Sequence, residues 1–143
     1  FFIFGGVFPE MGRQASIEFY SRNYDEALEL LSQAEDYLRF HHRSLDLDGL
    51  PPDHRLDVVL EVFRLTSRLT LSMNWLMNQK AAFSGEILSQ SEETVVISFS
   101  DRVVCLKRNR DVEETASPRF KRLLVNSHSL FSRIVRLEEG RVH

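Results

Sequence analysis

The longest unbroken helical pattern in the chain reads Val62-Phe63-Arg64-Leu65-Thr66-Ser67-Arg68-Leu69 and continues through Ser72-Met73-Asn74-Trp75-Leu76-Met77-Asn78-Gln79-Lys80. Its apolar residues point in too many directions for one contact face, whereas a surface helix carries a single apolar stripe. The pattern therefore predicts a central helix that other helices cover. Arg64 and Arg68 are four residues apart, so they share one side of this helix and form a basic row.

Two further amphipathic helices are predicted on either side of the central one. Between residues 15 and 42 the apolar residues recur at every third or fourth position with acids between them, which predicts the first helix. The central helix is predicted over 54–83, with Asp53 as its N-cap. Ser117-Pro118 is typical of a helix start, and the spacing that follows predicts a last helix over 118–139, which Gly140 would end.

The spacing of apolar residues in the segment 86–111 does not distinguish a helix from a strand. Its runs 94–99 and 102–106 are rich in β-branched residues, which favour strands. As a helix, however, Val96, Phe99 and Leu106 would fall near one face, and Ser91 could be the N-cap. No Asn-Gly or Gly-Gly turn separates the two runs. The residue pattern alone leaves helix and strand open for 91–107.

The chain has the size of a single domain, 1–143, because 143 residues of which 43% are hydrophobic can bury a substantial core. Three long helices, with an irregular or short helical excursion between the second and third, predict an all-α fold, a three-helix bundle. We expect residues 1–14 to form an irregular segment. Its apolar start is shorter than the roughly 20 residues of a membrane span and lacks the basic residue of a signal peptide. It either folds back onto the bundle or makes a dimer contact.

Charge is distributed unevenly along the chain. Residues 1–61 hold twelve Asp and Glu and five Lys and Arg, whereas residues 62–143 hold nine and thirteen. We therefore expect an acidic first helix beside basic later ones. The net charge of −3 does not indicate a polyanion partner. A basic cluster in the second half is the best candidate for contacting an acidic protein surface: Arg102, Lys107, Arg108, Arg110, Arg119, Lys121 and Arg122. DNA ranks lower, because interleaved aromatic residues and a helix-turn-helix pattern are missing.

No residue pattern indicates catalysis, a metal or a cofactor. Cys105 is the only cysteine, so a disulfide within the chain is excluded, and its apolar surroundings predict a buried, unreactive thiol. The run Asp46-Leu47-Asp48-Gly49 is similar to part of a calcium loop, but Arg55 stands where that loop needs Glu. Ser127-His128-Ser129 are neighbours on a helix, so their side chains diverge and form no catalytic triad.

The central helix also resembles a known family. Phe63 to Leu69, Ser72 to Ala81 and Gly85-Glu86-Ile87 are similar to the alphaproteobacterial helical proteins named for the regulator of CtrA degradation, of the DUF1465 type. The end of the last helix, Ser132-Arg133-Ile134-Val135-Arg136-Leu137, resembles the Arg-Ile-x-Arg-Leu end found there. The resemblance covers the chain from about Phe19 to Glu139. The helical character of this family is the reason why we favour helix over strand for 86–111.

The resemblance implies a non-enzymatic adaptor or scaffold that promotes delivery of cell-cycle regulators to the ClpXP protease. It further implies a homodimer in the cytoplasm, with polar foci, and a protein cargo or co-adaptor as partner. Six basic residues are the candidates for protein contact: Arg64, Arg68, Arg102, Lys107, Arg108 and Arg110. For Arg64 and Arg68, ion pairs with acids of the first helix are an equal alternative. We expect Trp75 in the core. The alternative function is a DNA-associated or other regulatory helical protein that uses the basic C-terminal half.

Overall fold

The chain is helical over nearly all of the residues that the structure describes. This computed structural model describes residues 9–84 and 97–142, and the side chains within 15–83 and 97–140. The helices are α2 (Pro9–Phe40), a π-helical turn η1 (Arg43–Leu47), α3 (Pro52–Ser84), α4 (Phe99–Leu106), α5 (Arg110–Thr115) and α6 (Pro118–Val142). No strand occurs in these two ranges, so the predicted all-α class is confirmed.

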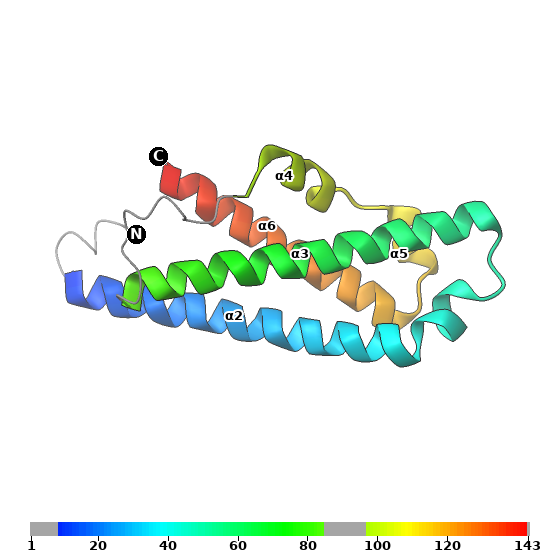
Figure 1. Cartoon of the computed structure of the whole chain (residues 1–143), viewed down its shortest axis with the longest axis horizontal. Coiled ribbons are helices and arrows are strands. Elements are labelled where there is room, and N and C mark those ends of the chain that lie inside the picture. The colour runs from blue at the N-terminus through cyan, green and yellow to red at the C-terminus, as the bar shows by residue number, and fades with distance from the viewer. Residues whose placement is uncertain (1–8, 85–96, 143) are drawn as a thin grey trace.

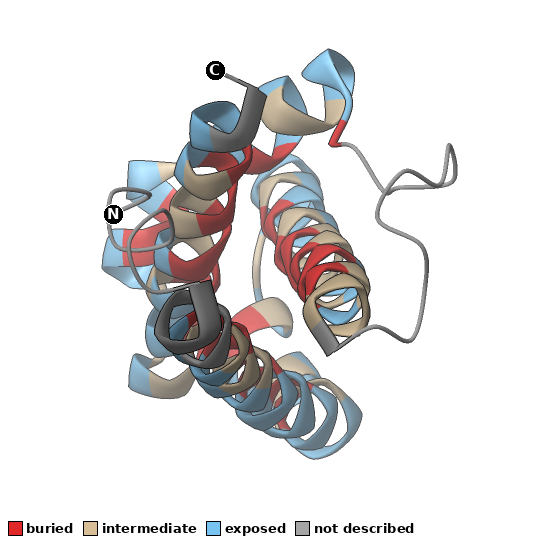
Figure 2. Cartoon of the chain, turned by 90° about the vertical axis from the view of Figure 1, so that its left-hand side faces the viewer, coloured by how far each residue is buried: buried red, intermediate tan, exposed pale blue. Residues whose placement is uncertain are grey.

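The three long helices contact one another, and α4 and α5 lie against α3 and α6 (Figure 1). Helices α2 and α3 run antiparallel side by side, and α6 crosses them at an angle. Buried residues line the inward faces of the long helices, and the outward faces are exposed (Figure 2). The largest fully buried apolar side chains come from all three: Tyr37, Leu65, Leu69, Trp75, Leu76, Phe120, Leu124, Leu130, Phe131 and Ile134. The expectation that Trp75 is a core residue is therefore confirmed.

Helix α2 and the turn after it differ from the predicted boundaries. The helix begins at Pro9, so residues 9–14 are helical rather than irregular; proline suits a first helical turn because its missing N–H needs no acceptor there. It ends at Phe40 rather than at residue 42, and η1 follows, in which Asp48 N donates to Arg43 O at 2.8 Å. Gly49 then takes φ of +85°, a conformation that favours glycine and reverses the chain.

Two predicted helix caps are wrong. Helix α3 begins at Pro52, and Arg55 N donates to Pro51 O at 2.9 Å, so Asp53 lies within the first turn instead of capping it. Its negative charge still interacts favourably with the N-terminal end of the helix dipole. Gly140 does not end α6, which continues to Val142. At the start of α6, Phe120 N donates to Ser117 Oγ at 3.4 Å.

Where the structure describes the ambiguous segment 86–111, it contains the short helix α4 and the first two residues of a second short helix, α5. Residues 85–96 lie outside the described residues, but 102–106 belong to α4 and are helical, not extended. Each short helix has a side-chain cap: Ser98 Oγ accepts from Asp101 N, and Asn109 Oδ1 accepts from Val112 N, both at 3.1 Å. Such caps satisfy amides that have no acceptor within the helix, which offsets the strand preference of the β-branched residues.

Ion pairs join the acidic α2 to the basic α6, as the distribution of charge predicts. Arg119 contacts Asp36 at 2.7 Å and Arg133 contacts Glu26 at 2.9 Å. The hydrogen bond from Arg119 keeps the pKa of Asp36 below its usual value. Because water and salt screen exposed ion pairs, these pairs contribute little to the stability of the fold.

A buried polar junction connects the end of α2 to the start of α6. The carboxylate of Asp46 accepts hydrogen bonds from the Tyr37 hydroxyl, from Ser117 N at 2.6 Å and from Ser117 Oγ at 2.6 Å. The Phe120 ring stacks on Tyr37, with 5.3 Å between ring centroids. Burial and the bond to Asp46 raise the pKa of Tyr37 above its usual value, so the phenol remains protonated. In this junction one carboxylate holds two elements that are distant in sequence.

Candidate protein-interaction surface

Arg68 lies inside the protein and is fully buried, so its predicted role in contacting a partner is wrong. Its Nε donates to Cys105 O at 2.8 Å, and its Nη2 donates to Lys107 O at 2.7 Å, at the C-terminal end of α4. Its Nη1 donates to Leu124 O and to Ser127 Oγ of α6, each at 3.2 Å. None of these acceptors is an acid of α2, so the alternative prediction is also wrong. The residue fastens α4 to α3 and α6.

The surroundings of Arg68 explain how a guanidinium is tolerated there. The last carbonyls of a helix have no intrahelical donor and carry partial negative charge, so a cation at the end of α4 is favourable. Burial lowers the pKa of Arg68, and the nearby carboxylate of Glu61 acts in the opposite direction. Because an arginine pKa lies far above neutral pH, the side chain stays charged and keeps all of its donors.

Arg64 is neutralised within its own helix. It forms an ion pair with Glu61, one turn earlier in α3, instead of with an acid of α2. The side chain of Glu61 is fully buried and that of Arg64 is mostly buried. Arg64 therefore compensates a buried carboxylate and offers little charge to a partner.

Arg102 and Arg108 also have acidic partners. Arg102 contacts Glu138 at 2.5 Å and Glu139 at 3.3 Å, which ties α4 to α6. Arg108 donates from Nε and Nη2 to the two carboxylate oxygens of Glu113, at 2.9 and 2.6 Å, a bidentate geometry. This hydrogen bonding keeps the pKa of Glu113 below its usual value. Arg102 therefore ties the excursion to α6, whereas Arg108 joins the end of α4 to α5 within the excursion.

The Arg108–Glu113 pair should be visible in the pH dependence of stability. The folded-state pKa of Glu113 is lowered, so the stabilisation is present above the ordinary value of 4.5 and is lost as pH falls through the lower folded value. We expect Glu113→Gln to reduce the unfolding free energy at pH 7 by about 1–3 kcal/mol and to reduce the loss of stability between pH 7 and pH 4. Urea unfolding at both pH values measures this, with the exposed Glu114→Gln as control. An unchanged pH dependence in Glu113→Gln would show that the pair contributes nothing.

Lys107 and Arg110 are the two candidates that remain exposed. Neither forms an ion pair with any residue in the described part of the chain. Of the other basic residues in the predicted cluster, Arg119 is paired with Asp36, whereas Lys121 and Arg122 lie exposed on α6. The cluster is therefore divided into neutralised arginines that stabilise the fold and free cations at the surface.

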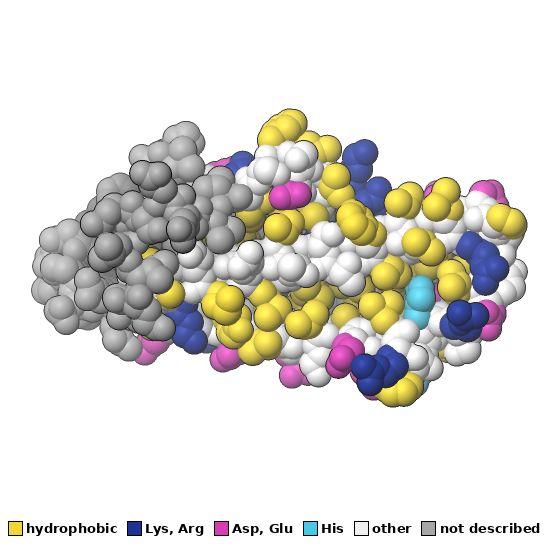
Figure 3. All heavy atoms as spheres, in the orientation of Figure 1, with side chains coloured by type: hydrophobic (Ala, Val, Ile, Leu, Met, Phe, Trp, Pro, Cys, Tyr) yellow, Lys and Arg dark blue, Asp and Glu magenta, His cyan; other side chains and the backbone are white. Residues whose placement is uncertain are grey.

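Large apolar side chains remain exposed on α3 and α4, and hydrophobic atoms extend over both helices on one face of the molecule (Figure 3). Five are on α3. Four of them have the helical spacing i, i+3, i+4, i+7, namely Leu56, Val59, Leu60 and Phe63, and the fifth is Met77. Four are on α4: Phe99, Val103, Val104 and Leu106. Phe99 is 81% and Phe63 58% exposed. The prediction that other helices cover α3 on all sides is thus wrong, because α2, α6 and the short α4 leave one face open.

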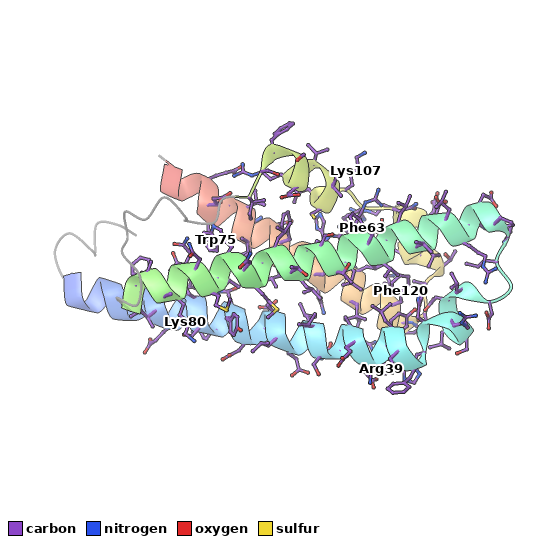
Figure 4. All side chains as sticks on the ribbon, viewed as in Figure 1. Arg39, Phe63, Trp75, Lys80, Lys107 and Phe120 are labelled. Carbon is purple, nitrogen blue, oxygen red and sulfur yellow. The ribbon has the colours of Figure 1, made fainter. Side chains whose placement is uncertain are left out.

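A shallow hollow of about 340 Å³ lies between α3 and α4, and one residue of each set, Phe63 and Val104, lines it. It is lined by Phe63, Thr66, Ser67, Thr70 and Leu71 of α3 and by Asp101, Val104 and Cys105 of α4. Figure 4 shows Phe63 on α3 and Lys107 after the end of α4, on the same side of the molecule. We call the four exposed residues of the α3 stripe, the four of α4 and this hollow the α3–α4 surface. Burial raises the pKa of Cys105, so its thiol is protonated and unreactive.

A family model described as a protein of unknown function (DUF1465) matches residues 11–143. The chain belongs to the DUF1465 family. The match includes α3 to α6 completely, and therefore the whole α3–α4 surface. No curated protein and no solved structure matches the chain.

Two side chains of the Ser127-His128-Ser129 run in this DUF1465 protein, Ser127 and His128, have structural partners. Ser127 accepts from Arg68, and His128 Nε2 lies 3.0 Å from Leu106 O. Burial lowers the pKa of His128. Within 9–84 and 97–142, no group of three or more His, Cys, Asp or Glu is placed to hold a metal ion. No helix in those ranges is apolar over a sufficient length to cross a bilayer.

The exposed apolar face of α3 has a signal in the sequence of this DUF1465 protein. Leu56, Val59, Leu60 and Phe63 have the spacing of one helical stripe. The buried residues Leu65, Leu69 and Leu76 form a second stripe on the opposite side. In the sequence, the two stripes together indicate a helix that is buried on all sides. The packing of the other helices buries the second stripe and leaves the first stripe exposed.

Proposed function

We propose that this DUF1465 protein is a non-enzymatic adaptor related to the regulator of CtrA degradation, which delivers cell-cycle regulators to the ClpXP protease. The observation that supports this is the α3–α4 surface. Its eight apolar residues are between 37% and 81% exposed. Large exposed apolar patches on soluble proteins are often sites of protein binding, so this surface suits a protein partner.

The proposed mechanism is binding alone. Helices α2, α3 and α6 form a three-helix bundle as scaffold, and Arg68 fixes α4 on it, so the contact surface is ordered before a partner arrives. An adaptor that holds protease and cargo together raises their effective concentration to about millimolar. We further propose a cytoplasmic homodimer as the active form.

The proposal is tested with the purified full chain as bait in native lysate, at low and high salt and with or without ATP. We expect protease subunits and cargo in the recovered fraction, and at least about five-fold faster cargo degradation by the purified protease when the chain is added. Light scattering of the eluted chain measures whether it is a dimer. Recovery of no protease subunit in any nucleotide condition, together with unchanged degradation, would contradict the adaptor function.

The exposed cations Lys107, Arg110, Lys121 and Arg122 support a second candidate, a DNA-associated regulator. If all four neutralised phosphates, duplex affinity would fall about 100-fold between 50 and 200 mM salt, from a slope of about −0.9 per contact. An electrophoretic mobility or anisotropy titration at both salt concentrations measures this. Absence of duplex binding at 50 mM salt removes this candidate.

A further inference from the structure

We propose that α4, together with Ile97 before it and Lys107 after it, is a strap that opens from α3 and α6 as one unit while the three long helices stay folded. The closed form, in which Arg68 fixes α4, predominates, and the open form is a minor state of the native protein. This inference concerns the chain without a partner, so it goes beyond the adaptor proposal and does not depend on it. Two observations carry it: α4 is attached mainly by polar bonds, and it turns its larger apolar side chains outward.

Helix α4 buries very little apolar surface. Cys105 is its only buried residue, and Ile97 is buried just before the helix begins. The larger apolar side chains of α4 face solvent instead, with Phe99 81% and Val103 43% exposed. Helix α6, by contrast, buries large apolar side chains from Phe120 to Ile134. Because burial of apolar surface is the dominant favourable term in folding, α4 is held less firmly than the long helices.

Polar bonds attach α4 at both ends. At its first end, Glu138 of α6 accepts from Ile97 N at 2.9 Å and from Arg102 at 2.5 Å. At its last end, Arg68 of α3 donates to two main-chain carbonyls, at 2.8 and 2.7 Å. The Nε of Arg102 is buried without a hydrogen-bond partner in the described residues, so the closed form leaves one donor unsatisfied. Water can replace these bonds when α4 leaves, so their net stabilisation of the closed form is modest.

Extended backbone borders α4 on both sides. Ser98, before the helix, has φ of −68° and ψ of 159°, and Lys107, after it, has φ of −66° and ψ of 148°. A helix of eight residues is too short to be stable by itself in water, so α4 loses its helical hydrogen bonds when it leaves α3 and α6. Opening is therefore cooperative over 97–107. Helix α5 stays in place, because Val112 and Glu113 are buried.

Opening changes the surface that a partner would meet. The thiol of Cys105, which is 1% exposed in the closed form, becomes accessible to solvent. Arg68 loses its two acceptors at the end of α4. The hollow beside Phe63 loses the side that α4 supplies. The α3–α4 surface therefore has two forms, one with α4 in place and one in which the same stretch of α3 is open.

Cys105 reports the opening directly, because it is the only cysteine of the chain and is buried on the inward side of α4. The test measures how fast a pyridyl disulfide labels the native full chain at increasing urea concentration, relative to an unfolded peptide with the same sequence around Cys105. We expect labelling at least about 100-fold faster than global unfolding alone allows. Its dependence on urea should be shallower, because opening of α4 exposes less surface than unfolding of the whole chain. Labelling at the rate set by global unfolding overturns the inference.

A pair of variants tests how α4 is attached. Arg102→Gln removes the ion pair between α4 and α6, and we expect at least about five-fold faster labelling of Cys105. Arg133→Gln is the matched control, because Arg133 pairs with Glu26 at 2.9 Å and joins α6 to α2 instead. It should leave the labelling rate unchanged. Circular dichroism verifies that both variants are folded. Equal acceleration by the two variants, or no acceleration by Arg102→Gln, overturns the inference.

Hydrogen exchange of the unmodified chain tests the same unit without any substitution. Relative to unfolded peptides, the amides that bond within α4 should exchange at least about 100-fold faster than those in the middle of α3 and α6. Equal protection of α4 and the long helices overturns the inference. Such a result leaves the adaptor proposal untouched, since that proposal is tested by recovery of protease and cargo.

Discussion

Replacement of Arg68 by Met is expected to lower the unfolding free energy by about 3–5 kcal/mol, because each buried acceptor left without a donor costs about 1–3 kcal/mol. Met fills a similar space but donates no hydrogen bond. The carbonyls of Cys105 and Lys107 then lose the donor that Arg68 supplies inside the protein. Leu124 O and Ser127 Oγ lose their bonds from Arg68 but keep the bond between them, at 3.1 Å. Urea unfolding followed by circular dichroism measures the loss.

Two further variants separate the role of Arg68 from a general effect of losing arginine. Arg136→Met changes an exposed position on α6 and should alter the free energy by no more than about 0.5 kcal/mol. Arg68→Lys keeps a positive charge, but its compact ammonium cannot reach acceptors on both α4 and α6, so it should also be strongly destabilising. Hydrogen exchange in Arg68→Lys should be accelerated most in α4. Equal stability of Arg68→Met and Arg136→Met would contradict the role assigned to Arg68.

The second large effect is expected at the buried junction between α2 and α6. Asp46→Ala should reduce the unfolding free energy by on the order of 3 kcal/mol, because Ser117 N and the Tyr37 hydroxyl lose a charged acceptor in a buried place. Asp48→Ala is the matched control, since Asp48 is exposed two residues later. Chemical denaturation of both variants gives the difference.

The variant Asp46→Asn separates the stability that the negative charge of Asp46 contributes from the stability that its hydrogen-bond acceptors contribute. Asn retains one acceptor oxygen, so this variant should lose less stability than Asp46→Ala. A double-mutant cycle with Tyr37→Phe should give a coupling energy of at least about 1 kcal/mol, as expected for directly bonded side chains. Additive effects in the cycle, or equal stability of Asp46→Ala and Asp48→Ala, would show that the junction does not stabilise the fold.

The sequence was sufficient for the helical class and for much of the core. Apolar residues repeat at helical spacing over long unbroken stretches, and this local property survives whatever the helices pack against. The same helical spacing of apolar residues predicted that Trp75 lies in the core, where it is fully buried. The uneven distribution of charge likewise anticipated the ion pairs Asp36–Arg119 and Glu26–Arg133. The similarity of the central helix to DUF1465 proteins agrees with the family match over residues 11–143.

The sequence could not separate structural arginines from free ones. Arg102, Lys107, Arg108 and Arg110 look equivalent as a basic cluster, yet two of them are neutralised by acids and two are exposed. An ion pair such as Arg102–Glu138 joins residues thirty-six positions apart. Which cation meets which carboxylate depends on how α4 lies on α6, and that arrangement has no local signal.

Only the tertiary structure decided which groups Arg68 bonds and which face of α3 stays exposed. The acceptors of Arg68 lie 37 to 59 residues away, and most are main-chain carbonyls, which every residue carries and no residue type marks. Helical periodicity predicts that the apolar residues of α3 lie on a helix, but burial is a property of the neighbouring helices. Packing left Leu56, Val59, Leu60 and Phe63 uncovered because α2 and α6 occupy the opposite sides of α3.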